Sequence, residues 1–314
     1  MSPARRRDRH DPVLPGPERV VPPGPSTIDL HTHTTRSDGI VAPAELVRQA
    51  FAAGVRLLAL TDHDNLAGYR EVVAAGAVPA SLTLIPGVEI NAIVPRDLGL
   101  WEGELHILGF GMDPDNEAFE TTLAGQRAAR RIRFERMLER LRELDMPIDA
   151  YLGDHATTDD DALGRPTVAR ALIAAGHAES VEDAFNRYLS WGKPAYVARN
   201  GLDPVGAIRA IRAAGGLPSL AHFSEAPQHV PVLRELVDAG LGGLEVYYRS
   251  FDVPTVAAVR DVADAIGLVA TGGTDYHGDF GPYAESHSML WVPPEVGPRL
   301  LDEIATVARS RPPA

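Results

Sequence analysis

Short apolar runs that alternate with amphipathic segments constrain the fold of this chain more than any other feature. Helical patterns lie between most of the runs. One of them begins at Pro43, and another begins at Pro204 and ends at a glycine. Strands that alternate with helices in this way predict a mostly parallel α/β sheet. Seven such units favour a closed or nearly closed barrel, and an open doubly wound sheet is the alternative. The strand-like runs occupy 29–33, 56–61, 82–90, 104–110, 217–223, 242–248 and 268–274, with a further run, SMLWV, at 288–292.

Residues 114–200 break this alternation, because they contain helical patterns and no convincing strand. Apolar residues at 119, 123, 132, 134, 137, 138 and 141 form a helical stripe, and Ser180 with Asp183 fits a capping box. We expect 114–200 to be a small helical domain, inserted as a substrate lid between two barrel parts at 27–113 and 201–314. The proline-rich segment 1–26 has mixed charge and no apolar stretch typical of a secretory signal, so it is expected to be a disordered tail.

Histidines and acidic residues recur where the predicted strands end. The carboxyl ends of barrel strands meet on one face, which is where barrel enzymes hold their active sites. Eight of nine candidates lie at or near such an end, whereas His106 lies within its run. The nine candidates are His31, His33, Asp38, His63, Glu89, His106, His222, Asp275 and His277.

The spacing of these residues indicates a metal site. Side chains at i and i+2 of an extended strand point the same way, so His31 and His33 can bind one ion, and Asp275 with His277 repeats the pattern. Six imidazoles with three carboxylates suit manganese, zinc or iron better than magnesium or calcium. At about four ligands per ion, nine ligands would serve two or three ions. A lone buried histidine is more often structural, but recurrence at successive strand ends argues against that reading here. The histidines at 10, 155, 177, 229 and 287 lack this placement and are expected to be surface or structural residues.

Composition limits the classes of protein and partner. With 45% apolar and 23% charged residues the chain is not mostly disordered, and no apolar run approaches the roughly 20 residues that span a bilayer. A net charge of −13 opposes binding to duplex nucleic acid, so an anionic substrate must be attracted by a local field such as a metal centre. The absence of cysteine excludes disulfides and thiolate sites and is compatible with a cytoplasmic location.

The segments DLHTHTTRSDG, LALTDHDN, PGVEI, ELHILGFGMDP, LAHF and GGTDYHGD resemble the PHP (polymerase and histidinol phosphatase) superfamily of metal-dependent phosphoesterases. Their order, together with GRPTVARAL in the insertion, resembles the subgroup that acts on nucleoside 3′,5′-bisphosphates and on the 5′ ends of short RNAs. The resemblance implies a distorted (β/α)₇ barrel with a trinuclear centre. In it, His31, His33, Glu89 and Asp275 would hold one ion; Glu89, His106 and His222 a second; and Asp38, His63 and His277 a third. Phe223 and Thr167 depart from the family pattern and could reshape the substrate pocket.

The expected reaction is hydrolysis of a phosphate ester by a metal-bridging hydroxide, without a covalent enzyme intermediate. Arg165 is the leading candidate for binding a second phosphate, Arg130, Lys193 and Arg249 are further candidates, and Tyr248 or Tyr247 could stack on a base. The seven arginines of 127–142 also fit a solvated helix face that pairs with Glu135 and Glu139. A histidinol-phosphate phosphatase and a non-catalytic metal or nucleotide sensor are the alternatives. The residues leave open the substrate, the native metal, the group that protonates the leaving oxygen, and the oligomeric state.

Overall fold

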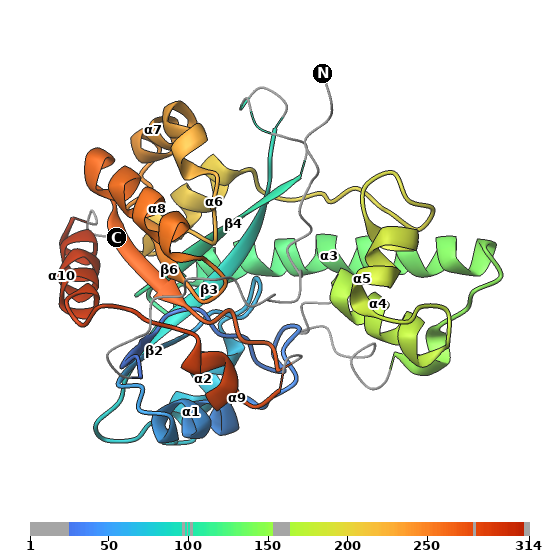
Figure 1. Ribbon diagram of the computed structural model, residues 1–314, viewed down its shortest axis with the longest axis horizontal. Helices are drawn as coiled ribbons and strands as arrows, with labels where there is room; N and C mark the ends of the chain where they lie inside the picture. Colours follow the sequence, from blue (N-terminus) through green and yellow to red (C-terminus); the bar gives the residue numbers. More distant parts are fainter. Residues whose placement is uncertain are drawn as a thin grey trace. The chain divides into compact units, whose positions relative to one another are not determined.

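The computed structural model describes residues 25–95, 98, 100, 103–152, 164–278 and 281–310. Among them, 25–129 and 200–310 form one compact α/β unit, the barrel unit, and 130–199 form a second, the helical unit. The division falls inside α3 (Glu117–Glu143), which Figure 1 shows as one helix. The predicted insertion boundaries at 114 and 200 and the role of a lid stay predictions.

The seven predicted strands are confirmed and form one sheet in chain order. The first three strands are parallel to one another, as are the last three, but β4 is antiparallel to both of its neighbours. The further run at 288–292 is not a strand: Ser288 ends a helix, and residues 289–292 lie in a turn and an irregular segment. The strands are β1 (Ile28–Asp29), β2 (Leu57–Leu60), β3 (Thr83–Ile93), β4 (Glu104–Phe110), β5 (Leu217–Leu220), β6 (Gly243–Tyr248) and β7 (Val269–Gly273).

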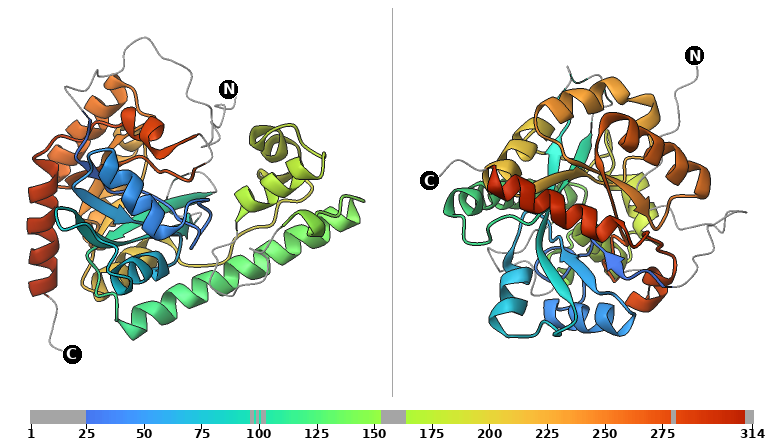
Figure 2. Two further views of the ribbon diagram at one scale, coloured as in Figure 1. Left: turned by 90° about the horizontal axis from the view of Figure 1, so that it is seen from below. Right: turned by 90° about the vertical axis from the view of Figure 1, so that its left-hand side faces the viewer.

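The last strand returns to the first and nearly closes the barrel. The backbone N–H of Leu30 donates to Gly272 O over 3.1 Å, and that of Asp275 donates to His31 O over 2.7 Å. Gly273 permits this approach, because a Cβ there would lie 2.4 Å from His31 Cβ and 2.5 Å from its backbone nitrogen. Figure 2 shows the helices of the barrel unit arranged around the strands. The fold is therefore the predicted distorted seven-stranded α/β barrel.

Helices cover the strands of the barrel unit and begin where the sequence favours it. Pro43 and Pro204 occupy the first turns of α1 and α6, as predicted. The Asp203 side chain caps α6 by accepting from Gly206 N over 2.6 Å. These helices are α1 (Pro43–Ala52), α2 (Ala67–Ala74), α6 (Pro204–Ala213), the short η5 (Ala226–Gln228), α7 (Val230–Asp238), α8 (Val253–Ile266), α9 (Tyr283–Ser288) and α10 (Val296–Arg309).

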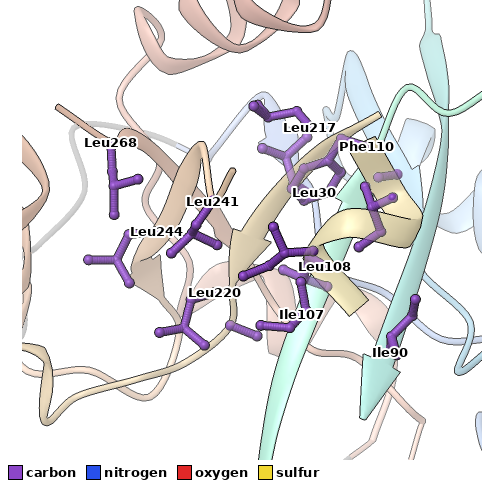
Figure 3. Packing of buried hydrophobic residues seen from close by; sticks show 14 of the residues in the cluster. Leu30, Ile90, Ile107, Leu108, Phe110, Leu217, Leu220, Leu241, Leu244 and Leu268 are labelled. Carbon is purple, nitrogen blue, oxygen red and sulfur yellow. The ribbon is translucent and has the colours of Figure 1, made fainter. Parts of the chain in front are cut away.

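Apolar side chains from successive strands fill the core of the barrel unit. Leu30, Leu108, Leu220 and Leu244 are fully buried and lie in one cluster (Figure 3). Truncating a leucine in such a core to alanine destabilises a protein by about 2–5 kcal/mol, since a cavity remains. The packed core therefore holds the strand ends, and the side chains that follow them, in fixed positions.

The helical unit has its own apolar cluster, which includes Phe134, Met137, Leu141 and Leu172. The predicted apolar stripe of α3 is buried except at Ile132, which is 51% exposed. The unit also contains η2 (Asp149–Tyr151), α4 (Arg165–Ala174), α5 (Val181–Ala184) and the π-helical turn η4 (Phe185–Leu189). The predicted cap of α5 is present, because Ser180 Oγ accepts from Asp183 N over 3.1 Å.

Two arginines of α3 make contacts within the helical unit. Arg133 is buried and donates to Val197 O over 2.9 Å, and Arg142 pairs with Asp149. The predicted solvated face is thus wrong for Arg133 and for Arg130, which is also buried.

Two sequence predictions fall on parts of the chain outside the description. The proposed tail lies almost entirely before residue 25, and His10 and His155 lie outside the described residues. Among the helices that are described, none is long and apolar enough to cross a membrane. The cytoplasmic location stays a prediction.

Candidate metal centre

All nine candidate ligands come together in the barrel unit, at the end where the parallel strands finish. They form three overlapping groups in which the ligand atoms lie within 4.8 Å of one another. The groups agree with those implied by the family resemblance, except that His33 belongs to two of them. They are His31, His33, Glu89 and Asp275; Glu89, His106 and His222; and His33, Asp38, His63 and His277.

The direction of β4 explains the position of His106 within its strand. Because β4 is antiparallel to β3 and β5, its first residues lie where the parallel strands end. His106 faces Asn91 across the β3–β4 ladder, whereas Glu89 faces Leu108. The apparent irregularity in the sequence therefore follows from one reversed strand.

The spacing of the first group fits a shared cation. His31 Nε2 lies 3.2 Å from Asp275 Oδ1 and 3.4 Å from Glu89 Oε2, and His33 Nε2 lies 3.2 Å from each of those oxygens. Two ligand atoms about 2.1 Å from one tetrahedral ion lie roughly 3.4 Å apart. His31 Nε2 is also buried without a hydrogen-bond partner among the described residues. A buried nitrogen of this kind is suited to donate its lone pair to a metal.

Glu89 lies at the centre of the site. Its Oε2 is 3.1 Å from His63 Nδ1, and its Oε1 is 2.5 Å from His106 Nδ1 and 3.5 Å from His222 Nε2. With His31 and His33, five imidazoles therefore surround one carboxylate. This arrangement is compatible with the predicted bridging role, which stays a prediction.

The pKa values show how strongly the imidazoles and carboxylates interact. Burial lowers the pKa of His33, but Asp275 and Glu89 outweigh it and raise the pKa to about 10. Burial raises the pKa of Glu89, but nearby imidazoles, His106 first among them, hold it well below its usual range. The same balance holds the pKa of Asp275 low through His31 and His33. Protons on imidazoles thus offset the buried carboxylates, and divalent cations can replace those protons.

Two candidate ligands have a left-handed backbone conformation that residues other than glycine rarely adopt. His222 has φ +31° and Asp275 has φ +50°. Each such residue costs about 1–3 kcal/mol, and such strain clusters at active sites and ligand clamps. The surrounding structure must therefore hold both residues in place.

The sequence analysis missed two buried acids that support the ligands. Glu245 Oε1 lies 3.0 Å from His31 Nδ1, and its Oε2 accepts from His222 N over 2.7 Å. Asp62 accepts from Thr34 N over 2.7 Å and from Ser37 Oγ over 2.7 Å, in the loop that carries Asp38. The available signals were an acid in the apolar run GGLEVYY and an acid directly before His63.

The barrel unit places two of the five predicted substrate-binding residues at the metal site. The Tyr248 hydroxyl donates to Asp275 Oδ2 over 3.0 Å, and Arg249 Nη2 lies 3.5 Å from Asp275 O. Tyr247, in contrast, is buried in the core. Both departures from the family pattern, Phe223 and Thr167, are buried.

The other three predicted substrate-binding residues belong to the helical unit. Arg130 is buried, Lys193 is exposed, and the Arg165 guanidinium lies over the Phe185 ring, 5.4 Å from its centroid. Their roles toward a substrate stay predictions.

Comparison with known proteins finds a family model and several relatives that match this chain. The PHP domain model matches residues 29–130. The 5′-3′ exoribonuclease Rnm of Salmonella typhimurium is 33% identical over 273 residues, which cover 84% of this chain and 89% of that protein. A 3′,5′-nucleoside bisphosphate phosphatase of Chromobacterium violaceum is 31% identical over 263 residues, covering 80% and 87%.

A solved structure extends the likeness to the fold. A protein from Bifidobacterium adolescentis, described as a metal-dependent phosphoesterase, is 32% identical with a TM-score of 0.76. The match covers 90% of this chain and 97% of that one. With relatives of this identity and coverage, the chain belongs to the PHP family.

Proposed function

We propose that this protein is a metal-dependent phosphoesterase that hydrolyses a phosphate ester of a nucleoside 3′,5′-bisphosphate or of the 5′ end of a short RNA. The convergence of nine histidine and acidic side chains in three overlapping groups carries the proposal. The relatives named as an exoribonuclease and as a bisphosphate phosphatase support the substrate class.

Charge supports two or three divalent ions, with manganese, zinc or iron favoured by the imidazoles. Asp38, Glu89, Asp275 and Glu245 are carboxylates that contact the imidazoles of the site. Two divalent cations would balance four negative charges, and a third would offset the charge of a phosphate dianion. Buried charges need such compensation, because the low-dielectric interior does not screen them.

The bound ions would lower the pKa of a water molecule and neutralise charge on the phosphoryl oxygens. The side chains of His31, His33 and Glu89 would hold that centre in place, and they are shielded from solvent because they are buried. Tyr248 acts as a neutral group: burial and Asp275 raise its pKa well above the usual range, and its hydroxyl donates to Asp275. It therefore orients this ligand and does not serve as a base.

The second phosphate of a bisphosphate needs a cationic partner. Arg165 is the leading candidate, with Arg130 and Lys193 from the helical unit and Arg249 from the barrel unit. Arg165→Ala should lower the hydrolysis of a bisphosphate more than that of a monophosphate. Arg142→Ala is the matched control, because Arg142 pairs with Asp149. An unchanged ratio in Arg165→Ala would exclude this role.

A phosphate-release panel with Mn²⁺ tests the proposed function. It compares a nucleoside 3′,5′-bisphosphate, a 5′-phosphorylated short RNA, histidinol phosphate and a nucleoside monophosphate. We expect release from one or both of the first two. Preference for histidinol phosphate would favour the histidinol-phosphate phosphatase reading, and metal binding without any release would favour a sensor.

A further inference from the structure

Glu245 of β6 is a buried carboxylate outside the nine candidate ligands, and its two oxygens contact two different ligands. We propose that Glu245 is a positioning residue that sets His31 and His222 for cation binding at two of the three groups. The inference rests on the proposed metal centre and deepens it, because it names a residue on which metal affinity depends.

The first contact fixes the ring of His31. A carboxylate oxygen only accepts, so the 3.0 Å contact makes His31 Nδ1 the donor to Glu245 Oε1. In the neutral imidazole that binds a metal, the lone pair then lies on Nε2, the atom that faces Asp275 Oδ1 at 3.2 Å and Glu89 Oε2 at 3.4 Å. Histidine ligands commonly donate their second ring nitrogen to a carboxylate, which fixes the tautomer and the ring orientation.

The second contact fixes the backbone of His222. Glu245 Oε2 accepts from His222 N over 2.7 Å. His222 has a φ of +31°, which residues other than glycine rarely adopt. This hydrogen bond holds the strained turn and directs the ring toward Glu89, with Nε2 3.5 Å from Oε1. The His31 and His222 rings stack with centroids 5.8 Å apart. One carboxylate thus connects a ligand of the His31 group with a ligand of the His106 group.

The ladder between β6 and β7 is irregular between Glu245 and Tyr247. A register shift of this kind changes the direction of the side chains that follow it. Downstream of the irregularity, Tyr248 also reaches the site and donates to Asp275.

Metal affinity measured on the full chain tests this role. Competition with a chromogenic chelator for Zn²⁺, and equilibrium dialysis with Mn²⁺, give affinity and stoichiometry without using catalysis. Glu245→Ala should weaken binding about 10–100-fold, the range seen when the partner of a metal ligand is lost. The number of tightly bound ions per chain should fall but stay above zero, because Asp38, His63 and His277 form a third group with His33.

Glu245→Gln gives a sharper comparison. The amide has one acceptor oxygen, so it can satisfy either His31 Nδ1 or His222 N but not both. Its affinity should fall between those of the wild-type protein and Glu245→Ala. Glu235→Gln, on the exposed face of α7, is the matched control and should bind metal as the wild-type protein does.

A purely structural role predicts another pattern: a lower unfolding midpoint of the metal-stripped protein with unchanged metal affinity. That pattern, or wild-type affinity in both Glu245 variants, would overturn the inference. If Glu245→Ala does not fold, Glu245→Gln carries the test, since it conserves size. If the wild-type protein binds metal but hydrolyses none of the four phosphate esters of the panel, the proposed function is refuted. The metal-affinity comparison of the Glu245 variants still tests the positioning role in that case.

Discussion

Raising the pH should destabilise this protein once its metal has been removed. In the metal-free site His33 has a pKa of about 10, because Asp275 and Glu89 outweigh the effect of burial. In the unfolded chain the pKa of a histidine is about 6.5. A raised folded-state pKa means that the stabilisation is complete below about pH 6.5 and is lost as the pH rises toward about 10.

The size of the effect follows from the number of protons bound. Between those two pKa values the folded protein holds one more proton at His33 than the unfolded chain does. The free energy of unfolding should then fall by about 1.4 kcal/mol per pH unit, or roughly 3 kcal/mol from about pH 7 to about pH 9. The pKa of His31 and that of His277 are also raised, which makes the dependence steeper. The loss is large beside a typical total stability of about 5–15 kcal/mol.

Urea denaturation with a chelator, at about pH 7, 8 and 9, measures this slope. The same series in excess Mn²⁺ should be flatter, because the ions have already displaced the protons. His33→Gln should reduce the slope of the metal-stripped protein, whereas His229→Gln, outside the site, should keep it. A metal-stripped protein whose stability is constant or rises across this range would contradict the reasoning.

Three further predictions concern the frame of the site. Glu89→Gln should weaken metal binding more than about 100-fold, since a direct ligand matters more than its partners, and dialysis against Mn²⁺ checks this. Gly273→Ala should destabilise the fold by about 1–3 kcal/mol in urea denaturation, because the new Cβ meets the backbone of His31. Asp62→Ala should cost on the order of 3 kcal/mol, because buried donors lose their acceptor. The same variant should weaken binding at the group that contains Asp38, which a fall in metal stoichiometry would show.

The strands, and the placement of eight of the nine candidate ligands at strand ends, could be read from the sequence because one rule governs them. Parallel strands end at one face of a barrel, so residues that follow the strands meet there regardless of their separation in sequence. His106 is also a candidate, but its position within the strand departs from that rule. The reversed direction of β4 explains the departure, and it is not visible in the run itself because apolar alternation has the same period in either strand direction. The signal that could have revealed this direction is the connection between β3 and β4. Residues 94–103 are too few for the crossover of about a dozen or more residues that a parallel pair needs.

The arginines of the insertion show a different limit. Guanidinium groups suit phosphates, but they suit backbone carbonyls and aromatic rings as well. Arg133 bonds to Val197 O, and Arg165 lies over Phe185, so both contribute to the packing of the helical unit. An excess of arginine therefore does not by itself indicate phosphate binding. The ratio of bisphosphate to monophosphate hydrolysis in the arginine variants is needed to separate phosphate binding from packing.

Glu245 and its partner His31 are separated by 214 residues, and only closure of the barrel brings them together. The same closure places Asp275 beside His31, through the backbone bond from Asp275 N to His31 O. Asp29 strengthens it, accepting from Thr274 N over 3.0 Å and from the Tyr283 hydroxyl over 2.7 Å. Metal affinity and fold stability are thus coupled through the β1–β7 junction. A substitution there should weaken cation binding even though it removes no ligand, and added cation should in turn stabilise the junction, because ions that bind only the folded state shift the folding equilibrium toward it.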